Sequence, residues 1–484
     1  MRKCLGNIAV MLTLGVALIL GACSKEETKS FVVPSGSILV SMPGQTGTTD
    51  FESANITSIS VTSQPVGWVI NDIDMYKGTI TVTAPSSFDN DEARYGNISL
   101  TAYTPTGATA SVTIYVAILE NEDVDYSAAP ANCYVATKYE TRYKFDPYTG
   151  GSSTPLATAS VKLLWQTRVD LIKYLDLRDG YVTFYLENAM DDDDNALNRV
   201  YDGNAVIGAY NEAGELIWSW HIWVTSTDPT ATENIVTING QELMNINLGA
   251  SCNSNGSTDH EKIHNSYGTY YQWGRKDPLP GPFSWRFDGN QDANLYNDAE
   301  KRLYLEYVAS SSETGTTEWL RSNPLTIILG NPENNYDWIY SGTNDTLWDA
   351  TTKSEDDPCP HGWRVPDGSV YETLTIAAAD DNMPWAEAQP LYGWRLEDTT
   401  NGSSYFFSAA GRRNYMDGRL DNMNDDMELP VPWSGYYWTA NTNGAKANAM
   451  YFDLNTQTRT WNGFESAHAM HRANALPIRC VREK

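Results

Sequence analysis

Between residues 35 and 119 the chain alternates apolar and polar residues with a period of two, and this pattern restricts its fold more than any other feature. Turn-forming residues separate four such segments, 56–61, 78–83, 98–103 and 111–116. Successive side chains of a β-strand point to opposite faces, so the alternation indicates half-buried strands. Several short strands spaced in this way predict a small β-sandwich over 35–119.

The rest of the chain is also expected to be mainly β. Gly, Thr, Asn, Tyr and Trp are frequent, while long stretches rich in Ala, Leu, Glu and Lys are missing. Such a composition favours strands joined by long loops. We expect a second β module over 126–228 and a third domain over 239–484, the number of domains that the length also suggests.

The second module contains a predicted hairpin. Residues 204–210 and 215–225 form its strands, and 211–214 its turn. In the returning strand, Trp218, Trp220 and Ile222 alternate with Ser219, His221 and Trp223, so both faces carry bulky side chains. We expect this strand to be covered on both sides. His221, placed among tryptophans, is interpreted as a packed, hydrogen-bonded residue and not as a catalyst.

The first 22 residues have the features of a signal peptide. Arg2 and Lys3 give a positive start, and an apolar stretch over 8–20 is too short to span a bilayer comfortably. Leu20-Gly21-Ala22-Cys23 then resembles the lipobox of bacterial lipoproteins, which implies cleavage before Cys23 and acylation of its thiol. Acyl chains such as palmitate would then hold the protein to a lipid bilayer, with 23–34 as a tether.

The residues after Cys23 point to a cell-surface location. Ser24-Lys25-Glu26-Glu27 resembles the acidic export signal with which Bacteroidota lipoproteins reach the outer face of the outer membrane. The alternating module over 35–119 also resembles the immunoglobulin-like or BACON-like spacers of such proteins. We therefore expect an outer-membrane lipoprotein displayed on the cell surface.

The charge of the chain excludes one class of partner. The formal net charge is −28, and it becomes −30 when Arg2 and Lys3 leave with a segment that contains no acid. Binding of nucleic acid through a basic patch is therefore not expected.

Six cysteines are present. Cys4 would leave with the signal and Cys23 would carry lipid, which leaves Cys133, Cys252, Cys359 and Cys480 in an oxidising compartment. These four predict one disulfide, or two, and the residues alone leave the pairing open.

The last domain contains an ordered set of motifs. They are Asn247-Leu248-Gly249-Ala250, 270–278 (YYQWGRKDP), 357–366 (DPCPHGWRVP), 407–413 (FSAAGRR), 435–440 (GYYWTA) and 476–482 (LPIRCVR). Together these motifs resemble the FISUMP family, the "major paralogous domain" of Bacteroidota and fibrobacterial surface proteins. The preceding block resembles a regular companion of that domain, through 131–135, 203–207 and 218–225.

The resemblance implies a fold similar to C-type lectins and formylglycine-generating enzymes, with small sheets, long loops and one helix. That helix is expected over 366–379, with Asp367 or Ser369 as N-cap. A disulfide between Cys359 and Cys480 is implied, closing a loop of about 120 residues and contributing roughly 4 to 5 kcal/mol. A second bridge, Cys133 to Cys252, is the less favoured alternative. The triplets typical of calcium-dependent sugar binding are missing.

Tryptophans supply the candidate ligand-binding residues. Eleven of the sixteen follow residue 239, and aromatic faces stack on sugar rings. Most tryptophans are packing residues, however, so each candidate has a structural alternative. The candidates are Trp285, Trp319, Trp385, Trp394 and Trp461.

Two motifs could bind metal but are discounted. His260-Glu261-Lys262-Ile263-His264 spells H-E-x-x-H, which binds zinc when it lies on a helix. Its flanks are typical of a loop and no third ligand follows in pattern, so we expect neither a helix nor a metal site. The acidic run 191–195 could hold calcium, but it lacks the glycine and distal glutamate of an EF-hand loop.

Three functions therefore stand as hypotheses. The first is a non-enzymatic surface lipoprotein whose last domain binds a glycan or a protein, for adhesion or capture. The second is a surface hydrolase acting on glycan or peptide, through 260–264 or through a carboxylate pair that the sequence does not reveal. The third is a structural fimbrial or envelope component.

Overall fold

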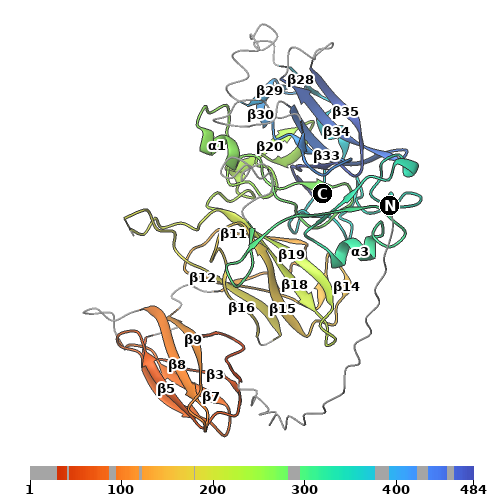
Figure 1. The fold of residues 1–484 in the computed structure, drawn as a ribbon. Coiled ribbons are helices and arrows are strands. Elements are labelled where there is room, and N and C mark those ends of the chain that lie inside the picture. The colour runs from red at the N-terminus through yellow and green to blue at the C-terminus, as the bar shows by residue number, and fades with distance from the viewer. Residues whose placement is uncertain are drawn as a thin grey trace, which may run out of the picture. The chain divides into compact units, whose positions relative to one another are not determined.

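In a computed structural model the chain is mainly β, as the composition predicts, and it folds into two compact units (Figure 1). The first unit ends at residue 116, and the second contains 39–45 and 117–484. Among the described residues, no helix is long and apolar enough to cross a bilayer. The structure describes residues 30–40, 43–86, 94–118, 123–178, 180–193, 195–281, 295–376, 392–421, 434–454 and 463–484.

The first unit contains the four predicted strands, which are therefore confirmed. It has a sheet in the order β2-β9-β8-β5 and another in the order β3-β7-β6, and β1 pairs with β4. Alternate residues of β7 and β8 are buried, such as Ile80 and Val82, or Ile98 and Leu100. Each sheet thus has one apolar face, as in a two-layer sandwich. The strands are β1 (Ser30–Val32), β2 (Ser37–Val40), β3 (Thr46–Asp50), β4 (Glu52–Ala54), β5 (Ser58–Ser63), β6 (Val69–Asp74), β7 (Thr79–Thr83), β8 (Tyr95–Tyr103) and β9 (Thr109–Ile118).

The expected tether 23–34 is wrong in its last residues. Strand β1 pairs antiparallel with β4 inside that range. Phe31 and Val33 are buried, and the Phe31 ring lies edge-on to Phe51, with 5.6 Å between ring centroids. Apolar side chains at alternate positions allow this short segment to join the sandwich.

The second unit begins with two sheets that share an apolar core. One has the order β10-β12-β17-β16, and the other has the order β11-β19-β18-β15-β23-β24. Aromatic rings from β11, β12, β17 and β19 meet between them. The strands from this block are β10 (Val124–Asp125), β11 (Cys133–Ala136), β12 (Thr141–Phe145), β13 (Thr149–Gly150), β14 (Thr154–Pro155), β15 (Ser160–Gln166), β16 (Lys173–Arg178), β17 (Tyr181–Leu186), β18 (Gly203–Tyr210) and β19 (Leu216–Val224).

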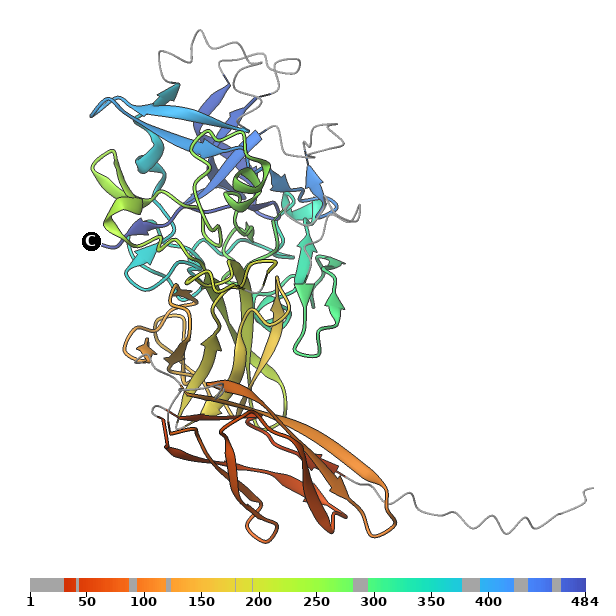
Figure 2. The same cartoon turned by 90° about the vertical axis from the view of Figure 1, so that its left-hand side faces the viewer.

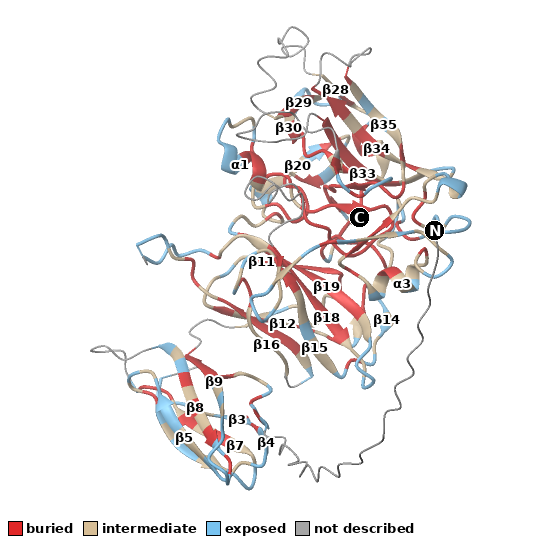
Figure 3. Cartoon of the chain, in the orientation of Figure 1, coloured by how far each residue is buried: buried red, intermediate tan, exposed pale blue. Residues whose placement is uncertain are grey.

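The predicted hairpin is confirmed as β18 and β19, which pair antiparallel. Seven consecutive residues of β19, from Trp218 to Val224, are buried, so the strand is covered on both faces as expected (Figure 3). Trp220 and Ile222 pack into the core between the two sheets. Trp223 packs instead among residues of the third block.

The third block consists of small sheets and long loops. Its first strands pair with each other, and β21 also pairs with β37 near the C-terminus. The elements are η1 (Thr232–Asn234), β20 (Ile235–Ile238), β21 (Gln241–Met244), α1 (His260–Asn265), β22 (Tyr271–Gln272), β23 (Leu295–Tyr296), β24 (Arg302–Leu303), β25 (Glu306–Ala309), α3 (Thr317–Ser322), β26 (Thr326–Leu329), η3 (Pro332–Asn334), β27 (Trp363–Arg364), η4 (Gly368–Tyr371), β28 (Leu374–Ile376), β29 (Gly393–Asp398), β30 (Ser403–Ser408), β31 (Arg412–Arg413), β32 (Leu420–Asp421), β33 (Ser434–Asn443), β34 (Lys446–Asp453), β35 (Phe464–His471), β36 (Ala475–Leu476) and β37 (Val481–Arg482).

The helix expected over 366–379 is wrong. After the Cys-Pro motif the described residues form the 3₁₀ turn η4, and strand β28 begins three residues after it. The Asp367 side chain does accept from the backbone N–H of Ser369, as an N-cap would. β-Branched residues at Thr373, Thr375 and Ile376 favour the strand, which pairs with β29. Residues 377–379 lie outside the described part of the chain.

The boundary expected between 228 and 239 does not separate two compact units. Strand β23 of the third block extends the sheet of the preceding block by pairing with β15. Behind β19, the Lys276 ammonium is buried and donates to both Asp277 carboxylate oxygens and to the Ser219 hydroxyl. We call this junction between residues 123–228 and 232–484 the seam; in both views β15, β18 and β19 run up to the third block (Figures 1 and 2).

Candidate functional site

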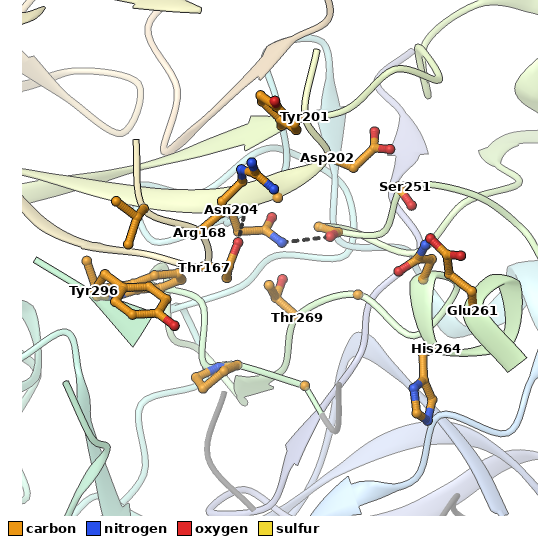
Figure 4. Close-up of a pocket in the computed structure, with 18 of the residues that line it drawn as sticks. Thr167, Arg168, Tyr201, Asp202, Asn204, Ser251, Glu261, His264, Thr269 and Tyr296 are labelled. Carbon is orange, nitrogen blue, oxygen red and sulfur yellow. Dashed lines mark hydrogen bonds between the residues drawn. The ribbon is translucent and has the colours of Figure 1, made fainter. Parts of the chain in front are cut away.

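A cavity of about 460 Å³ opens at the seam. We call it the seam pocket (Figure 4). It is lined from one side by residues that follow β15 and precede β18, and from the other side by α1 and loops of the third block. Tyr296 lies toward one end, while Glu261 and His264 lie at the other. Because both blocks contribute walls, the pocket exists only where they meet.

Asn204 forms the centre of the pocket floor. Its side-chain Nδ2 donates to the carbonyl oxygen of Gly249 (2.9 Å), and its backbone N–H donates to the Thr167 hydroxyl (2.9 Å). Gly249 has a φ of +81°, and a Cβ there would lie 2.6 Å from the Thr269 hydroxyl oxygen. The glycine of the Asn-Leu-Gly-Ala motif is therefore needed for the chain to approach Asn204 this closely.

His221 holds Asn204 from behind. Its Nε2 is 2.8 Å from Asn204 Oδ1, and its Nδ1 is 3.3 Å from the Tyr271 hydroxyl. Since Asn204 Nδ2 is used on Gly249, its Oδ1 must accept, which assigns the proton to His221 Nε2. Burial lowers the pKa of His221 to about 3, so the ring is neutral. The interpretation of His221 as a packed, hydrogen-bonded residue is confirmed.

The rim carries two arginines in different situations. Arg199 forms an ion pair with Asp202 (3.2 Å), and Asp202 also accepts from the backbone and hydroxyl of Ser226. The Arg168 guanidinium lies over the Tyr201 ring, 3.6 Å from its centroid. The Tyr201 hydroxyl is fixed in turn, because it accepts from the backbone N–H of Met190 (2.8 Å).

The H-E-x-x-H segment is helical, which corrects the expectation of a loop. It forms α1, and the Asp259 carboxylate caps the helix by accepting from the Glu261 N–H (3.0 Å). Glu261 and His264 line the pocket, whereas His260 is exposed and does not. Among the residues described, no three His, Cys, Asp or Glu side chains gather closely enough to hold a metal ion.

The acidic run 191–195 forms a turn around one of its own carboxylates. Asp191 accepts from the backbone N–H groups of Asp193 (3.0 Å) and Asn195 (2.8 Å). The hydrogen bonds from Asn195 lower the pKa of Asp191. Its oxygens are thus used within the turn, and Asp194 lies outside the described residues.

The candidate tryptophans do not meet in one site. Trp394 is wrong as a ligand-binding residue, because it is buried in a core cluster and its ring lies edge-on to Phe452. Trp319, on α3, is half-buried against the main core of the third block. Trp285, Trp385 and Trp461, like Cys23, lie outside the described residues, so their roles stay predictions.

Two cysteines are paired and two are free. Cys359 and Cys480 form a disulfide, the pair that the resemblance implied. Cys133 and Cys252 do not pair, so that alternative is wrong. Cys133 is buried on β11, where burial raises the pKa of its thiol, and burial raises the pKa of Cys252 to about 11. Neither thiol is ready to ionise at neutral pH.

Most of the residues that line the pocket could not be identified from the sequence. Asn204 and Gly249 belonged to noted motifs, and Glu261 and His264 to a discounted one. Arg168 and Tyr201 lie in connections, and Tyr296 ends the two-residue strand β23. None of the three belongs to a periodic stretch or a motif, so no pattern in this one chain distinguishes them.

Comparison with known proteins gives no family. No protein-family description and no curated protein sequence matches the chain. Partial structural matches include the D00–D0 domain of intimin, with 10% identity over 40% of this chain and 96% of that chain and a TM-score of 0.17. Another is the Bacteroides ovatus mixed-linkage glucan utilization protein SGBP-B in complex with a mixed-linkage heptasaccharide. There the identity is 12% over 40% of this chain and 43% of that chain, with a TM-score of 0.12. A tandem of titin immunoglobulin domains matches with 9% identity over 41% of this chain and 97% of that chain, and a TM-score of 0.15. TM-scores this low carry no argument about fold or function.

Proposed function

We propose that this protein is a surface lipoprotein whose second unit binds a glycan in the seam pocket. The observation that carries the proposal is the pocket itself. It combines tyrosine rings at Tyr201 and Tyr296 with fixed polar groups at Asn204 and Thr269. Ligand sites of this kind use aromatic surface for contact area and a few placed polar groups for orientation.

The pocket is organised before any ligand arrives. Asn204 is held by three hydrogen bonds, and the Thr269 hydroxyl donates to the Leu248 carbonyl while lying 3.1 Å from the Tyr271 hydroxyl. Groups fixed in this way lose little conformational entropy on binding. Sugar hydroxyls, which both donate and accept, suit a wall of amide and hydroxyl groups.

The anchoring part of the proposal rests on the N-terminal sequence. The lipobox-like residues before Cys23 and the acidic residues after it support acylation and display on the outer membrane. The motifs that resemble FISUMP domains support the same setting. Metabolic labelling with an alkyne-bearing fatty acid tests this part, and Cys23→Ala is expected to abolish the label.

A glycan array tests the binding. The full chain, purified in detergent, is compared with Tyr296→Ala and with Tyr148→Ala, which removes an exposed tyrosine of the same unit outside the pocket. We expect binding to a defined sugar class that is lost in Tyr296→Ala and kept in Tyr148→Ala. If no glycan binds, or if both variants bind like the parent, the pocket is not a glycan site.

A zinc-dependent hydrolase is the second candidate, favoured by one observation. Glu261 and His264 lie on a helix and line the same pocket. Against it, His260 is exposed and outside the lining. Metal analysis of the purified protein decides, since about one zinc per chain, lost in His264→Gln, is the stoichiometry that this mechanism requires.

A further inference from the structure

The two arginines of the seam pocket differ in whether an acid neutralises their charge. This difference deepens the proposed function, because it indicates the chemical class of the ligand. Arg199 is compensated by Asp202. Among the residues described, no carboxylate lies within ion-pair distance of the Arg168 guanidinium, and none of its N–H groups has a hydrogen-bond acceptor. Arg168 is therefore the pocket cation whose charge remains available.

Arg168 is also held in place. Its guanidinium lies over the Tyr201 ring, and the Tyr201 hydroxyl is held by the backbone N–H of Met190. A stacked guanidinium keeps its planar edge of donors free, and that edge matches the two oxygens of a carboxylate. Because the side chain is already ordered, pairing with a ligand loses less entropy than pairing with a free surface arginine.

The rest of the molecule makes this cation unusual. The chain has a formal net charge of −28, so anions are repelled in general and attracted only where a cation is exposed. Within the described part of the chain, Glu261 is the acid of the pocket wall that forms no ion pair, and it lies on α1, away from Arg168 in Figure 4. The pocket thus has a cationic side near Tyr201 and polar, uncharged groups at its floor.

We infer that the seam pocket takes an acidic sugar, a uronic-acid residue whose carboxylate pairs with Arg168 while its hydroxyls meet Asn204 and Thr269. This inference rests on the proposed glycan binding and adds the charge of the ligand. A neutral sugar would use the floor alone and leave Arg168 solvated.

Calorimetry on the full chain tests the inference with galacturonic-acid oligomers and the matching neutral galactose oligomers. We expect the acidic oligomer to bind at least about tenfold more tightly, as suits one charge-assisted bidentate pair. Arg168→Gln is expected to remove this preference, so that the acidic oligomer binds no more tightly than the neutral one. The matched control is Lys162→Gln. It removes an exposed cation outside the pocket, whose Nζ lies 4.8 Å from the centroid of the Tyr210 ring, and it is expected to leave both affinities unchanged.

The outcomes separate the two proposals. Equal affinity for acidic and neutral oligomers, or a preference that survives Arg168→Gln, overturns the acidic-sugar inference and leaves glycan binding in place. A sulfated galactose that binds more tightly than the uronic acid also overturns it, because the site then recognises charge and not a planar carboxylate. Failure of every sugar to bind, with the glycan array also blank, overturns the proposed function itself.

Discussion

The two faces of β19 differ in what they pack against. One face, with Trp220 and Ile222, enters an apolar core in which Trp220 lies edge-on to Phe145, with 5.0 Å between ring centroids. The opposite face presents Ser219 and His221, each hydrogen-bonded to residues of the third block or the pocket floor. The apolar contacts of the first face stabilise the sheets but are not directional, whereas the hydrogen bonds of the second face fix one geometry at the seam.

Because of this division, one strand contributes both to the apolar core and to the geometry of the seam pocket. Apolar contacts tolerate small shifts, whereas buried polar groups are costly unless every partner is in place. We therefore expect substitutions on the apolar face to lower stability broadly. Substitutions on the polar face should instead leave buried charges without partners, change the pH dependence of stability, or alter the geometry of the seam pocket.

The largest effect is expected from Trp220→Ala. Removing a fully buried indole leaves a cavity, and the free energy of unfolding of the second unit should fall by about 4 kcal/mol. Urea unfolding followed by fluorescence measures this. Trp319→Ala, at a half-buried position, is the control and should lose clearly less. A loss below about 1 kcal/mol for Trp220→Ala would contradict the assignment of this face as core.

On the polar face, Asp277→Ala should cost about 3 kcal/mol, because it leaves the buried Lys276 ammonium without its carboxylate. Burial already lowers the pKa of Lys276, and the carboxylate opposes that shift. Adding Lys276→Met to this variant removes the stranded charge and should recover part of the loss. Unfolding free energies of the two single variants and the double variant measure the coupling.

A more exposed ion pair provides the control for this cycle. Lys173 and Glu187 are 2.8 Å apart but keep 21% and 30% of their side chains exposed. Glu187→Ala should cost less than about 1 kcal/mol. Equal losses at Glu187 and Asp277 would show that burial does not strengthen the dependence of Lys276 on its partner.

A third test uses pH. The pKa of His221 is about 3 in the folded protein against an ordinary 6.5, so below pH 6.5 the unfolded chain takes up a proton that the folded protein does not. Stability from this group is fully present above pH 6.5 and is lost as pH falls toward 3, by about 2 kcal/mol between pH 7 and 5. His221→Gln should remove this part of the slope in pH-dependent unfolding. His361→Gln, at an exposed site, should not.

The smallest effect is expected from Ser219→Ala. Its hydroxyl lies 2.5 Å from both the Lys276 ammonium and Asp277 Oδ1, but Lys276 and Asp277 keep each other as partners when it is lost. The cost should be about 1 kcal/mol. A loss as large as that of Asp277→Ala would mean that the hydroxyl, and not the ion pair, holds the polar face.

The strands were predictable where one period ran without interruption. The alternation in β7, β8 and β9 and the bulk on both sides of β19 each identified an element. The cap at Asp367 could not show that a strand, and not a long helix, follows, because the 3₁₀ turn η4 uses the same capping residue. The β-branched residues after η4 favour the strand. At 260–264 a loop was expected and a helix forms, because the Asp259 carboxylate caps a short helix between flanks typical of a loop.

The seam could not be predicted from the sequence for a different reason. Its contacts join residues far apart in the chain, such as Gln166 with Tyr296, or Asn204 with Gly249. Local patterns carry no information on such pairs. Lys276 and Asp277 stood in a noted motif, but only the fold shows that they are buried together against Ser219.

The pairing of β21 with β37 brings the start and the end of the third block to the same place, and the disulfide of Cys480 lies beside it. The chain between these two strands therefore begins and ends at adjacent positions in the fold. Such an arrangement tolerates insertions, because a longer segment between the two strands still ends at the same β21–β37 pairing. An exposed turn such as that at Gly342, where a side chain would meet nothing within 4 Å, is a natural place to graft a foreign epitope without disturbing the seam.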